Sequence, residues 1–131
     1  MSKNANILII DDDPDFRLQL QLQLQGLGHS VVEAEDATEG WKVLQEQAGS
    51  IDLVIVDLMM EESDAGFTFC YRAKKNYPDL PVVIATAVGK ETGMEFDSET
   101  KEERNWIKAD KVIDKPIRTE QLEKILNELF N

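Results

Sequence analysis

The chain has 131 residues, a length that favours one domain with a sizeable hydrophobic core. Its net charge of −12 argues against direct binding to nucleic acid or to an anionic membrane surface. The single cysteine, Cys70, excludes an internal disulfide and a cysteine-based metal site, and is expected to fill the core. Because the sequence shows neither a membrane-length apolar run nor a signal-peptide start, we expect a cytoplasmic protein.

Residues 5–10 form the first apolar run and are expected to be a strand. Asp13 is placed to cap a helix that Pro14 begins. The body of this helix, residues 17–25, alternates leucine with glutamine, and strict alternation is typical of a strand. However, both residue types are good helix formers and Gly26 suits a C-terminal cap, so we predict a helix.

Turning 100° per residue divides the apolar side chains of this helix between two faces. One face is expected to lie in the core: Phe16, Leu20, Leu24 and Leu27. Leu18 and Leu22 fall nearly opposite. They are either scattered surface residues or part of a surface that binds a partner.

A second, shorter strand over residues 29–34 precedes a capping-box sequence at residues 36–39. The box opens a helix whose apolar stripe is Ala37, Trp41, Leu44 and Ala48. Residues 51–56 are apolar apart from Asp52 and run directly into Asp57. Such a run, without polar alternation, predicts a strand buried on both faces at the centre of a parallel sheet.

Helices and strands are expected to alternate through the second half of the chain. The expected elements are a helix over residues 66–76, a strand over 82–86, a polar loop over 88–97, a helix over 98–108, a strand over 111–114 and a helix over 119–130. The inward-facing residues are expected to be Phe67, Cys70 and Ala73 in the first of these helices and Leu122, Ile125, Leu126 and Leu129 in the last. Five strands alternating with helices predict an α/β fold, a doubly wound five-stranded parallel sheet with right-handed crossovers and helices on both faces.

Polar residues follow four of the predicted strands at their carboxyl ends: Asp11 and Asp12, Asp57, Thr86, and Lys115. These ends share one edge of a parallel sheet, so the side chains are expected to converge. Clustered carboxylates favour a hard cation such as Mg²⁺, and an aspartate beside the cation can act as a nucleophile toward phosphorus. Taken singly, Asp57 is also explained as a helix cap, Thr86 as an ordinary strand end and Lys115 as a solvated turn residue. Their joint occurrence at successive strand ends favours chemistry.

The pattern resembles the receiver domain of two-component response regulators, in particular the chemotaxis regulators. The matching motifs are ILIIDD at residues 7–12, LVIVDL at 53–58, IATA at 84–87 and DKP at 114–116, with GHSV at 28–31 and DLPV at 79–82. Each motif is weak alone, but their order and spacing cover essentially the whole chain. The resemblance implies the flavodoxin-like strand order 2-1-3-4-5. It also implies a single receiver domain over residues 1–131, with no effector domain in this chain.

The resemblance implies that Asp57 is the phosphoacceptor and receives phosphate from a phosphohistidine on a sensor histidine kinase or phosphotransfer protein. It implies a Mg²⁺ site made by three carboxylates and one backbone carbonyl, those of Asp11, Asp12, Asp57 and Met59. Asp12 would bind the ion directly, whereas Asp11 would act mainly through water. Lys115 would pair with the phosphoryl oxygens, and Thr86 would be the switch hydroxyl. Phosphorylation would change the surface that binds a downstream protein, which the sequence does not name, in a monomer or weak dimer.

The sequence departs from the family pattern in three places. Met60 is followed by Glu61, where the family usually has proline, and Gly66 comes about one residue late. The segment containing residues 89–103 is longer than usual. Val112 stands where the family usually has an aromatic residue that couples to the switch hydroxyl. We therefore do not expect the aromatic switch, and expect the signal to leave through the long segment.

Two further expectations concern single residues. Met59 and Val88, each two positions past a site residue, are apolar where a polar side chain would position an attacking water. This predicts slow self-dephosphorylation. His29, in a Gly-His-Ser turn, is expected to be a surface residue rather than a phosphorelay histidine.

Two other functions also use a carboxyl-edge site in an α/β fold. A Mg²⁺-dependent phosphatase or phosphotransferase would use Asp57 as its nucleophile, but the haloacid dehalogenase class wants a second aspartate where Met59 stands. A flavodoxin-like FMN carrier needs a phosphate-binding loop after the first strand, where residues 11–13 would repel phosphate. We therefore expect a signalling module rather than an enzyme, either as a stand-alone regulator or as a fragment of a longer protein.

Overall fold

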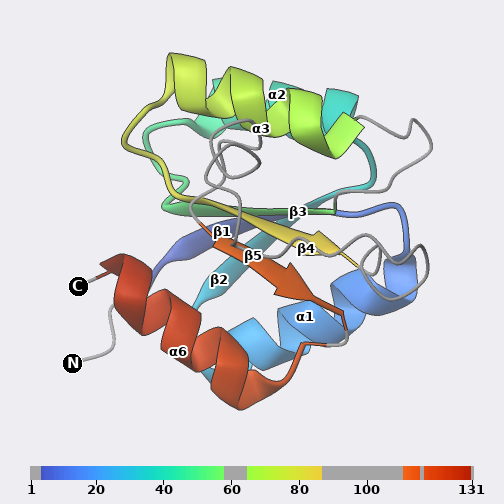
Figure 1. Cartoon of the computed structure of the whole chain (residues 1–131), viewed down its shortest axis with the longest axis vertical. Helices are drawn as coiled ribbons and strands as arrows, with labels where there is room; N and C mark the ends of the chain where they lie inside the picture. The colour runs from blue at the N-terminus through green and yellow to red at the C-terminus, as the bar shows by residue number, and fades with distance from the viewer. Residues whose placement is uncertain (1–3, 58–64, 87–110, 116, 131) are drawn as a thin grey trace, which may run out of the picture.

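Five parallel strands form a single sheet in the order β2-β1-β3-β4-β5 (Figure 1). The computed structural model describes residues 4–57, 65–86, 111–115 and 117–130, of which 65–67, 86 and 114 are described by their backbone alone. The strands are β1 Asn6–Ile10, β2 Ser30–Ala34, β3 Leu53–Asp57, β4 Val82–Thr86 and β5 Lys111–Asp114. The predicted order 2-1-3-4-5, and with it the flavodoxin-like doubly wound fold, is confirmed.

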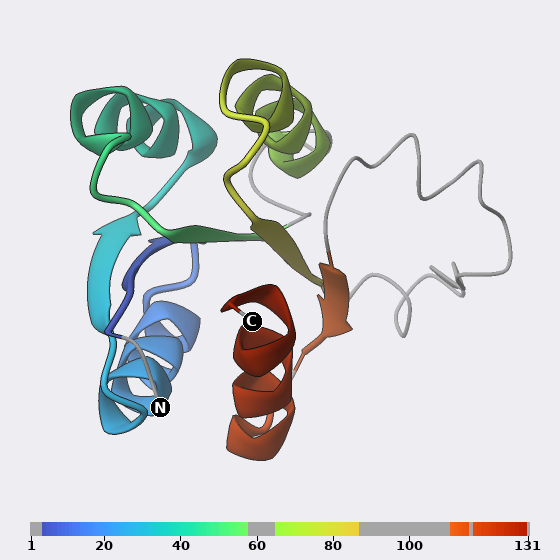
Figure 2. The same cartoon turned by 90° about the vertical axis from the view of Figure 1, so that its left-hand side faces the viewer.

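Within the described ranges, four helices cover the two faces of this sheet: α1 Pro14–Gly26, α2 Ala37–Gln47, α3 Ala65–Asn76 and α6 Thr119–Phe130. Figure 2 shows α2 and α3 on one face and α1 and α6 on the other. None of the described helices is long and apolar enough to cross a membrane. The loop predicted over residues 88–97 and the helix predicted over 98–108 lie outside the described residues.

Each face of the sheet carries its own hydrophobic core. Leu8 and Ile10 of β1 contribute to the core under α2 and α3, whereas Ile7 and Ile9 contribute to the core under α1 and α6. Successive side chains of a strand point to opposite faces, so a strand covered on both faces needs apolar residues at every position. This explains why polar residues do not alternate with apolar ones in β1 and β3. In β3 all five residues are buried.

The leucine-glutamine repeat is a helix, as predicted. Phe16, Leu20 and Leu24 are buried, and Leu27 is partly buried against the same core. Leu18 and Leu22 are 54% and 60% exposed. Only the helical spacing of these leucines matches the apolar face that the sheet covers, which decides against the strand alternative.

The predicted cap of this helix is wrong by two residues. Gly26 is the last helical residue, and the capping glycine is Gly28, whose φ of 95° lies in the left-handed region. The amide of His29 donates to the Leu24 carbonyl at 3.0 Å and that of Gly28 to the Gln25 carbonyl at 3.0 Å. This is the Schellman pattern, which places the glycine one position beyond the cap residue, Leu27 here.

Helix α2 begins at the predicted cap. The Asp36 carboxylate accepts from the Glu39 amide at 2.7 Å, and the Glu39 carboxylate accepts from the amide of Glu35 at 3.1 Å. Gly40 lies directly against Ile10 of β1, so that a Cβ at this position would clash. The helix therefore approaches the sheet more closely than any larger residue would allow.

In α3 the buried residues are Phe69, Cys70 and Ala73. The predictions for Cys70 and Ala73 are confirmed, while the side chain of Phe67 lies outside the described residues. Phe69 was not predicted and packs edge-on against Trp41 of α2, with ring centroids 6.0 Å apart. Phe69 is therefore buried because α3 packs against α2, a contact that the helical spacing within α3 does not indicate.

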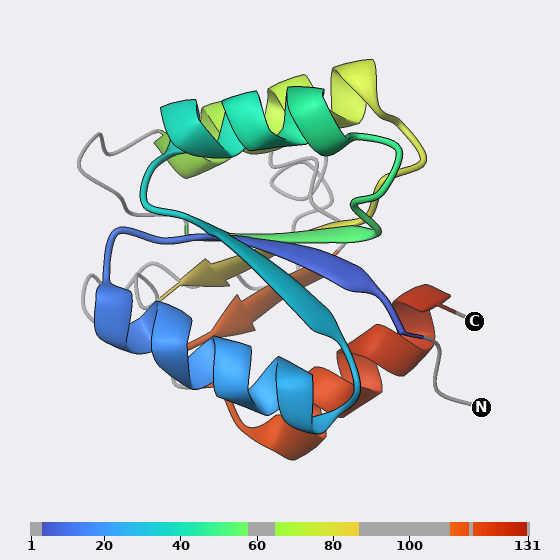
Figure 3. The ribbon, with the colours of Figure 1, turned by 180° about the vertical axis from the view of Figure 1, so that it is seen from behind.

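His29 is buried, so the prediction that it is a surface residue is wrong. Only 9% of its surface is exposed, and its Nδ1 accepts from the Ala5 amide at 3.1 Å. The ring also lies 6.2 Å from that of Phe130, because the start of β1 and the end of α6 meet at one end of the molecule (Figure 3). Burial lowers the pKa of His29 below its usual 6.5.

Because of the lowered pKa of His29, we predict that the fold becomes less stable as the pH falls below neutral. The unfolded chain takes up a proton below pH 6.5 while the folded chain resists it, so the free energy of unfolding falls from that pH down to the lowered folded pKa. Protonated Nδ1 also cannot accept from the Ala5 amide. Urea unfolding at several pH values between about 7 and 5.5 should show a shallower loss in His29→Leu than in the wild type. Identical slopes in the two chains would contradict the prediction.

Candidate functional site

Three strands deliver charged residues to the carboxyl edge of the sheet. Asp11 and Asp12 directly follow β1, Asp57 ends β3, and Lys115 directly follows β5. The strands are parallel and in register, with Ile10 beside Val56 at the ends of β1 and β3. Side chains more than 100 residues apart in sequence therefore meet at one place, as in other open α/β sheets.

Asp11 is the most deeply placed of these groups, with 1% of its surface exposed. Its Oδ1 accepts from the Asp13 amide at 2.9 Å, and its Oδ2 accepts from Lys115 Nζ at 2.8 Å. Its own amide donates to the Ala34 carbonyl of β2 at 3.2 Å. The carboxylate is thus held in one orientation by the start of α1 and by Lys115 after β5, while β2 fixes the backbone of the same residue.

Asp57 and Asp12 complete a cluster of three carboxylates. Asp57 is 5% exposed, whereas Asp12 is exposed to solvent. Together with Asp11, each offers one oxygen, and these atoms all lie within 4.8 Å of one another. An oxygen-only donor set with one solvent-facing carboxylate fits a hard divalent cation that keeps several waters, such as Mg²⁺.

Lys115 is the cation of the cluster. Its Nζ lies 2.8 Å from Asp11 Oδ2 and 3.5 Å from Asp57 Oδ2. The same atom lies over the Phe16 ring, 4.1 Å from its centroid. The ammonium therefore stands between two buried carboxylates, one of which ends the central strand, and compensates part of their mutual repulsion.

Arg17 holds the backbone of the acidic turn in place. This role was not predicted from the sequence. Its Nε donates to Glu33 of β2 at 3.1 Å, and its Nη1 donates to the backbone carbonyl of Asp11. This arginine thus ties α1 and β2 to the turn that carries the acidic residues. Nothing in the sequence pairs residue 17 with residue 33, because the contact depends on how α1 lies over the β1–β2 edge.

Two of the predicted site residues are described less fully. Thr86 ends β4 with its backbone opposite Asp114, one position past Ala85, which pairs with Asp57. Its side chain lies outside the described residues, as do Met59 and its carbonyl and Val88. The roles predicted for these residues stay predictions.

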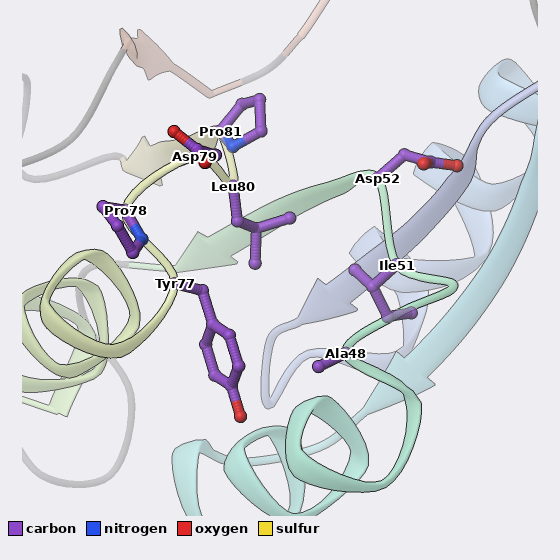
Figure 4. A pocket seen from close by; sticks show the side chains of 8 residues that line it. All are labelled: Ala48, Ile51, Asp52, Tyr77, Pro78, Asp79, Leu80 and Pro81. Carbon is purple, nitrogen blue, oxygen red and sulfur yellow. The ribbon is translucent and has the colours of Figure 1, made fainter.

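The groove in Figure 4 lies at the opposite edge of the sheet, where β3 and β4 begin. It encloses about 360 Å³ beside Ile51, Tyr77 and Leu80. Its two acidic residues, Asp52 and Asp79, point in different directions (Figure 4). The groove lacks the convergence of charged groups that distinguishes the carboxyl edge, which is therefore the candidate functional site.

Comparison with known proteins agrees with this architecture. The family model for the response regulator receiver domain matches residues 7–127. The transcriptional regulatory protein GlrR of Escherichia coli is 44% identical over 87 residues, which are 66% of this chain and 19% of that protein. The chain thus spans about a fifth of the length of that relative.

Solved structures show the same likeness in three dimensions. A response regulator receiver domain protein from Clostridium thermocellum superposes with a TM-score of 0.81 at 28% identity, over 97% of this chain and 94% of that one. The chemotaxis protein CheY4 of Vibrio cholerae has a TM-score of 0.79 at 26% identity, with 97% and 99% coverage. The family match covers the carboxylate cluster and all five strands apart from Asn6, the first residue of β1. This chain belongs to the family of response regulator receiver domains.

Proposed function

We propose that this receiver domain is phosphorylated on Asp57 in a two-component phosphorelay in the cytoplasm, with Mg²⁺ as cofactor. The observation that carries the proposal is the Lys115 ammonium between two buried carboxylates, 2.8 Å from Asp11 and 3.5 Å from Asp57. A structural ion pair needs one carboxylate, whereas this site clusters three carboxylates, and the Lys115 ammonium lies within 3.5 Å of two of them. Such an excess of negative charge is suited to a divalent cation and a phosphoryl group.

The chain's own residues account for the transfer. A carboxylate oxygen of Asp57 forms a bond to phosphorus as the bond from phosphorus to the donor's imidazole nitrogen breaks. The imidazole, protonated on its other nitrogen, keeps the electron pair of that bond and leaves as a neutral histidine, so that an aspartyl phosphate remains. Lys115 lies where its ammonium can balance charge on the phosphoryl oxygens. Asp11, Asp12, Asp57 and the Met59 carbonyl would hold Mg²⁺, which supplies further positive charge at those oxygens when bound. Thr86 would donate a hydrogen bond as the switch hydroxyl.

Incubation with acetyl phosphate tests the proposal directly. With MgCl₂ present, mass spectrometry of the intact chain should show a gain of one phosphoryl group per chain. The gain should disappear when EDTA replaces MgCl₂. A chain without any mass gain would contradict phosphorylation, and continuous consumption of acetyl phosphate beyond one equivalent would support the phosphatase or phosphotransferase alternative.

We predict that the phosphorylated chain loses its phosphate slowly. Met59 and Val88 are apolar and offer no side chain that could orient an attacking water. After removal of acetyl phosphate, the phosphorylated mass should persist for many minutes. Met59→Asn adds a polar side chain and should shorten that lifetime. Decay of the wild type within seconds would contradict the prediction.

The partner that supplies phosphate is proposed to be a sensor histidine kinase or a phosphotransfer protein. Leu18 and Leu22 form an exposed apolar pair on α1, the helix that begins beside the acidic residues. Leu18→Gln combined with Leu22→Gln should therefore slow phosphotransfer from such a partner several-fold or weaken self-association, without changing phosphorylation by acetyl phosphate. Tyr71→Gln, at a residue of α3 that is 52% exposed, is the matched control. Unchanged phosphotransfer and unchanged sedimentation would remove this surface from consideration.

A further inference from the structure

We propose that Phe16 is a positioning residue for phosphorylation, whose ring keeps the Lys115 ammonium beside Asp57 when a divalent cation occupies the carboxylate cluster. The inference rests on the proposed function, since it assigns a role within the same site. It concerns a residue that the sequence indicates only as part of the core. The carrying observation is the position of Lys115 Nζ over the Phe16 ring, 4.1 Å from its centroid.

The contact is built from two anchored segments. Phe16 lies in the first turn of α1, where the Asp13 carboxylate caps the helix by accepting from the Asp15 amide at 3.0 Å. Phe16 is 9% exposed and belongs to the core that also contains Ile117, two residues past Lys115. The ring and the lysine therefore have little freedom to move apart by backbone motion alone.

A second tie joins the same two segments. The side-chain amide of Gln23 donates to the Ile117 carbonyl at 2.9 Å and to Thr119 Oγ1 at 3.2 Å. One turn of α1 thus holds the chain that follows Lys115, while the first turn supplies the ring beneath the ammonium. The contact between ring and ammonium therefore lies beside two hydrogen bonds that join α1 to the segment leading into α6.

The ring differs in kind from the two carboxylates that contact the ammonium among the described residues. Asp11 and Asp57 attract Lys115 through formal charges, which a divalent cation at the same carboxylates neutralises while it repels the ammonium. The face of an aromatic ring attracts a cation through its quadrupole, and no metal ion competes for it at this position. Of these three partners, Phe16 is thus the one whose attraction survives metal binding, when Lys115 must face the incoming phosphoryl group.

Phe16→Leu keeps an apolar side chain in the core and removes the aromatic face. Without the ring, Lys115 should leave Asp57 more readily when Mg²⁺ binds. We expect phosphorylation by acetyl phosphate at saturating Mg²⁺ to slow about fivefold, as expected for the loss of one cation–π contact. Mg²⁺ should bind at least as tightly as in the wild type, because the competing ammonium is held less firmly. A misfolded variant would instead show both slower phosphorylation and weaker Mg²⁺ binding.

Nuclear magnetic resonance of the side chain gives a readout that does not depend on phosphorylation. Protons on the Lys115 carbon next to Nζ should be shifted upfield by the ring in the wild type, both in EDTA and with Mg²⁺, and should lose the shift in Phe16→Leu. Phe16→Tyr keeps the ring and should restore both the shift and the rate. Leu24→Val, a change in the same core away from Lys115, should alter neither.

A series of phenylalanines with increasing fluorination at position 16 separates the ring's charge distribution from its shape. The phosphorylation rate at saturating Mg²⁺ should fall stepwise as the ring face becomes less negative. An unshifted Lys115 resonance in the Mg²⁺-bound wild type, a rate unaffected by fluorination, or failure of Phe16→Tyr to restore the rate would each overturn the inference. If the wild type is not phosphorylated at all, the proposed function fails instead, while the Lys115 resonance still reports whether the ring holds the ammonium.

Discussion

Asp57→Asn is expected to abolish the Mg²⁺-dependent mass gain with acetyl phosphate while the fold is retained. The substitution keeps the size of the side chain at the end of β3, but an amide is not a competent nucleophile toward phosphorus. It also removes one of three carboxylates that lie within 4.8 Å of one another, so Mg²⁺ should raise the melting temperature less than in the wild type. Intact-mass measurement and thermal unfolding with EDTA or MgCl₂ test the two effects separately.

Asp52→Asn is the matched control for this prediction. Asp52 precedes β3, at the opposite edge of the sheet from Asp57, and its carboxylate accepts from the Asn6 amide at 2.9 Å. This variant should be phosphorylated at the wild-type level and should keep the full response of its melting temperature to Mg²⁺. A mass gain in Asp57→Asn equal to that in Asp52→Asn would show that another residue accepts the phosphoryl group.

Lys115→Met is expected to destabilise the chain strongly in the absence of Mg²⁺. Removal of the ammonium leaves Asp11, 1% exposed, next to Asp57, 5% exposed, without their shared cation. Breaking a buried charge pair on one side costs about 3 kcal/mol, and this loss should appear as a lower free energy of unfolding in urea with EDTA present. If Mg²⁺ occupies the same carboxylates in the folded chain, as proposed, adding it should recover much of the loss.

Lys111→Met is the control for this effect, since Lys111 lies four residues earlier and begins β5. Its ammonium pairs with Glu128 at 2.6 Å, but the two side chains are 40% and 42% exposed. The side-chain hydrogen bond from Lys111 lowers the pKa of Glu128, yet a solvent-exposed pair contributes little to stability. Equal losses in the two variants, or a loss in Lys115→Met that Mg²⁺ does not reduce, would contradict the assignment of Lys115 to a buried cluster.

The two lysine variants also separate stability from chemistry. Once Mg²⁺ has restored the fold of Lys115→Met, its phosphorylation by acetyl phosphate should remain slow, because no ammonium faces the phosphoryl oxygens. Lys111→Met should react at the wild-type rate. Restoration of both fold and rate by Mg²⁺ would limit Lys115 to a structural role.

The strands and the residues at their ends could be predicted from the sequence pattern, whereas the strand order came from the family resemblance. An uninterrupted apolar run such as residues 53–56 indicates a strand that is buried on both faces. Such strands are typical of parallel sheets that are covered by helices on both sides. The position of Asp57 at the end of such a run places it at the edge where parallel sheets bind ligands. These signals are local, so they survive in the sequence without knowledge of the packing.

Where two nearby signals compete, the local rule gave the wrong answer. Gly26 and Gly28 are both candidates for the cap of α1, and only the backbone hydrogen bonds of Gly28 and His29 show which one is used. The position of His29 beside Phe130 depends on the meeting of β1 and α6. No pattern within the turn itself indicates that a histidine there will be buried.

By itself, then, the sequence determined the fold, the edge of the sheet that carries the site, and the acidic and basic residues that occupy it. Only the tertiary structure decided that Lys115 lies between Asp11 and Asp57, that its ammonium lies over Phe16, and that Arg17 ties the acidic turn to β2. The physical reason is the range of the interactions. Periodicity and capping act over a few residues, whereas the contacts that position these charges join segments of up to 104 residues apart and exist only once both faces of the sheet are packed.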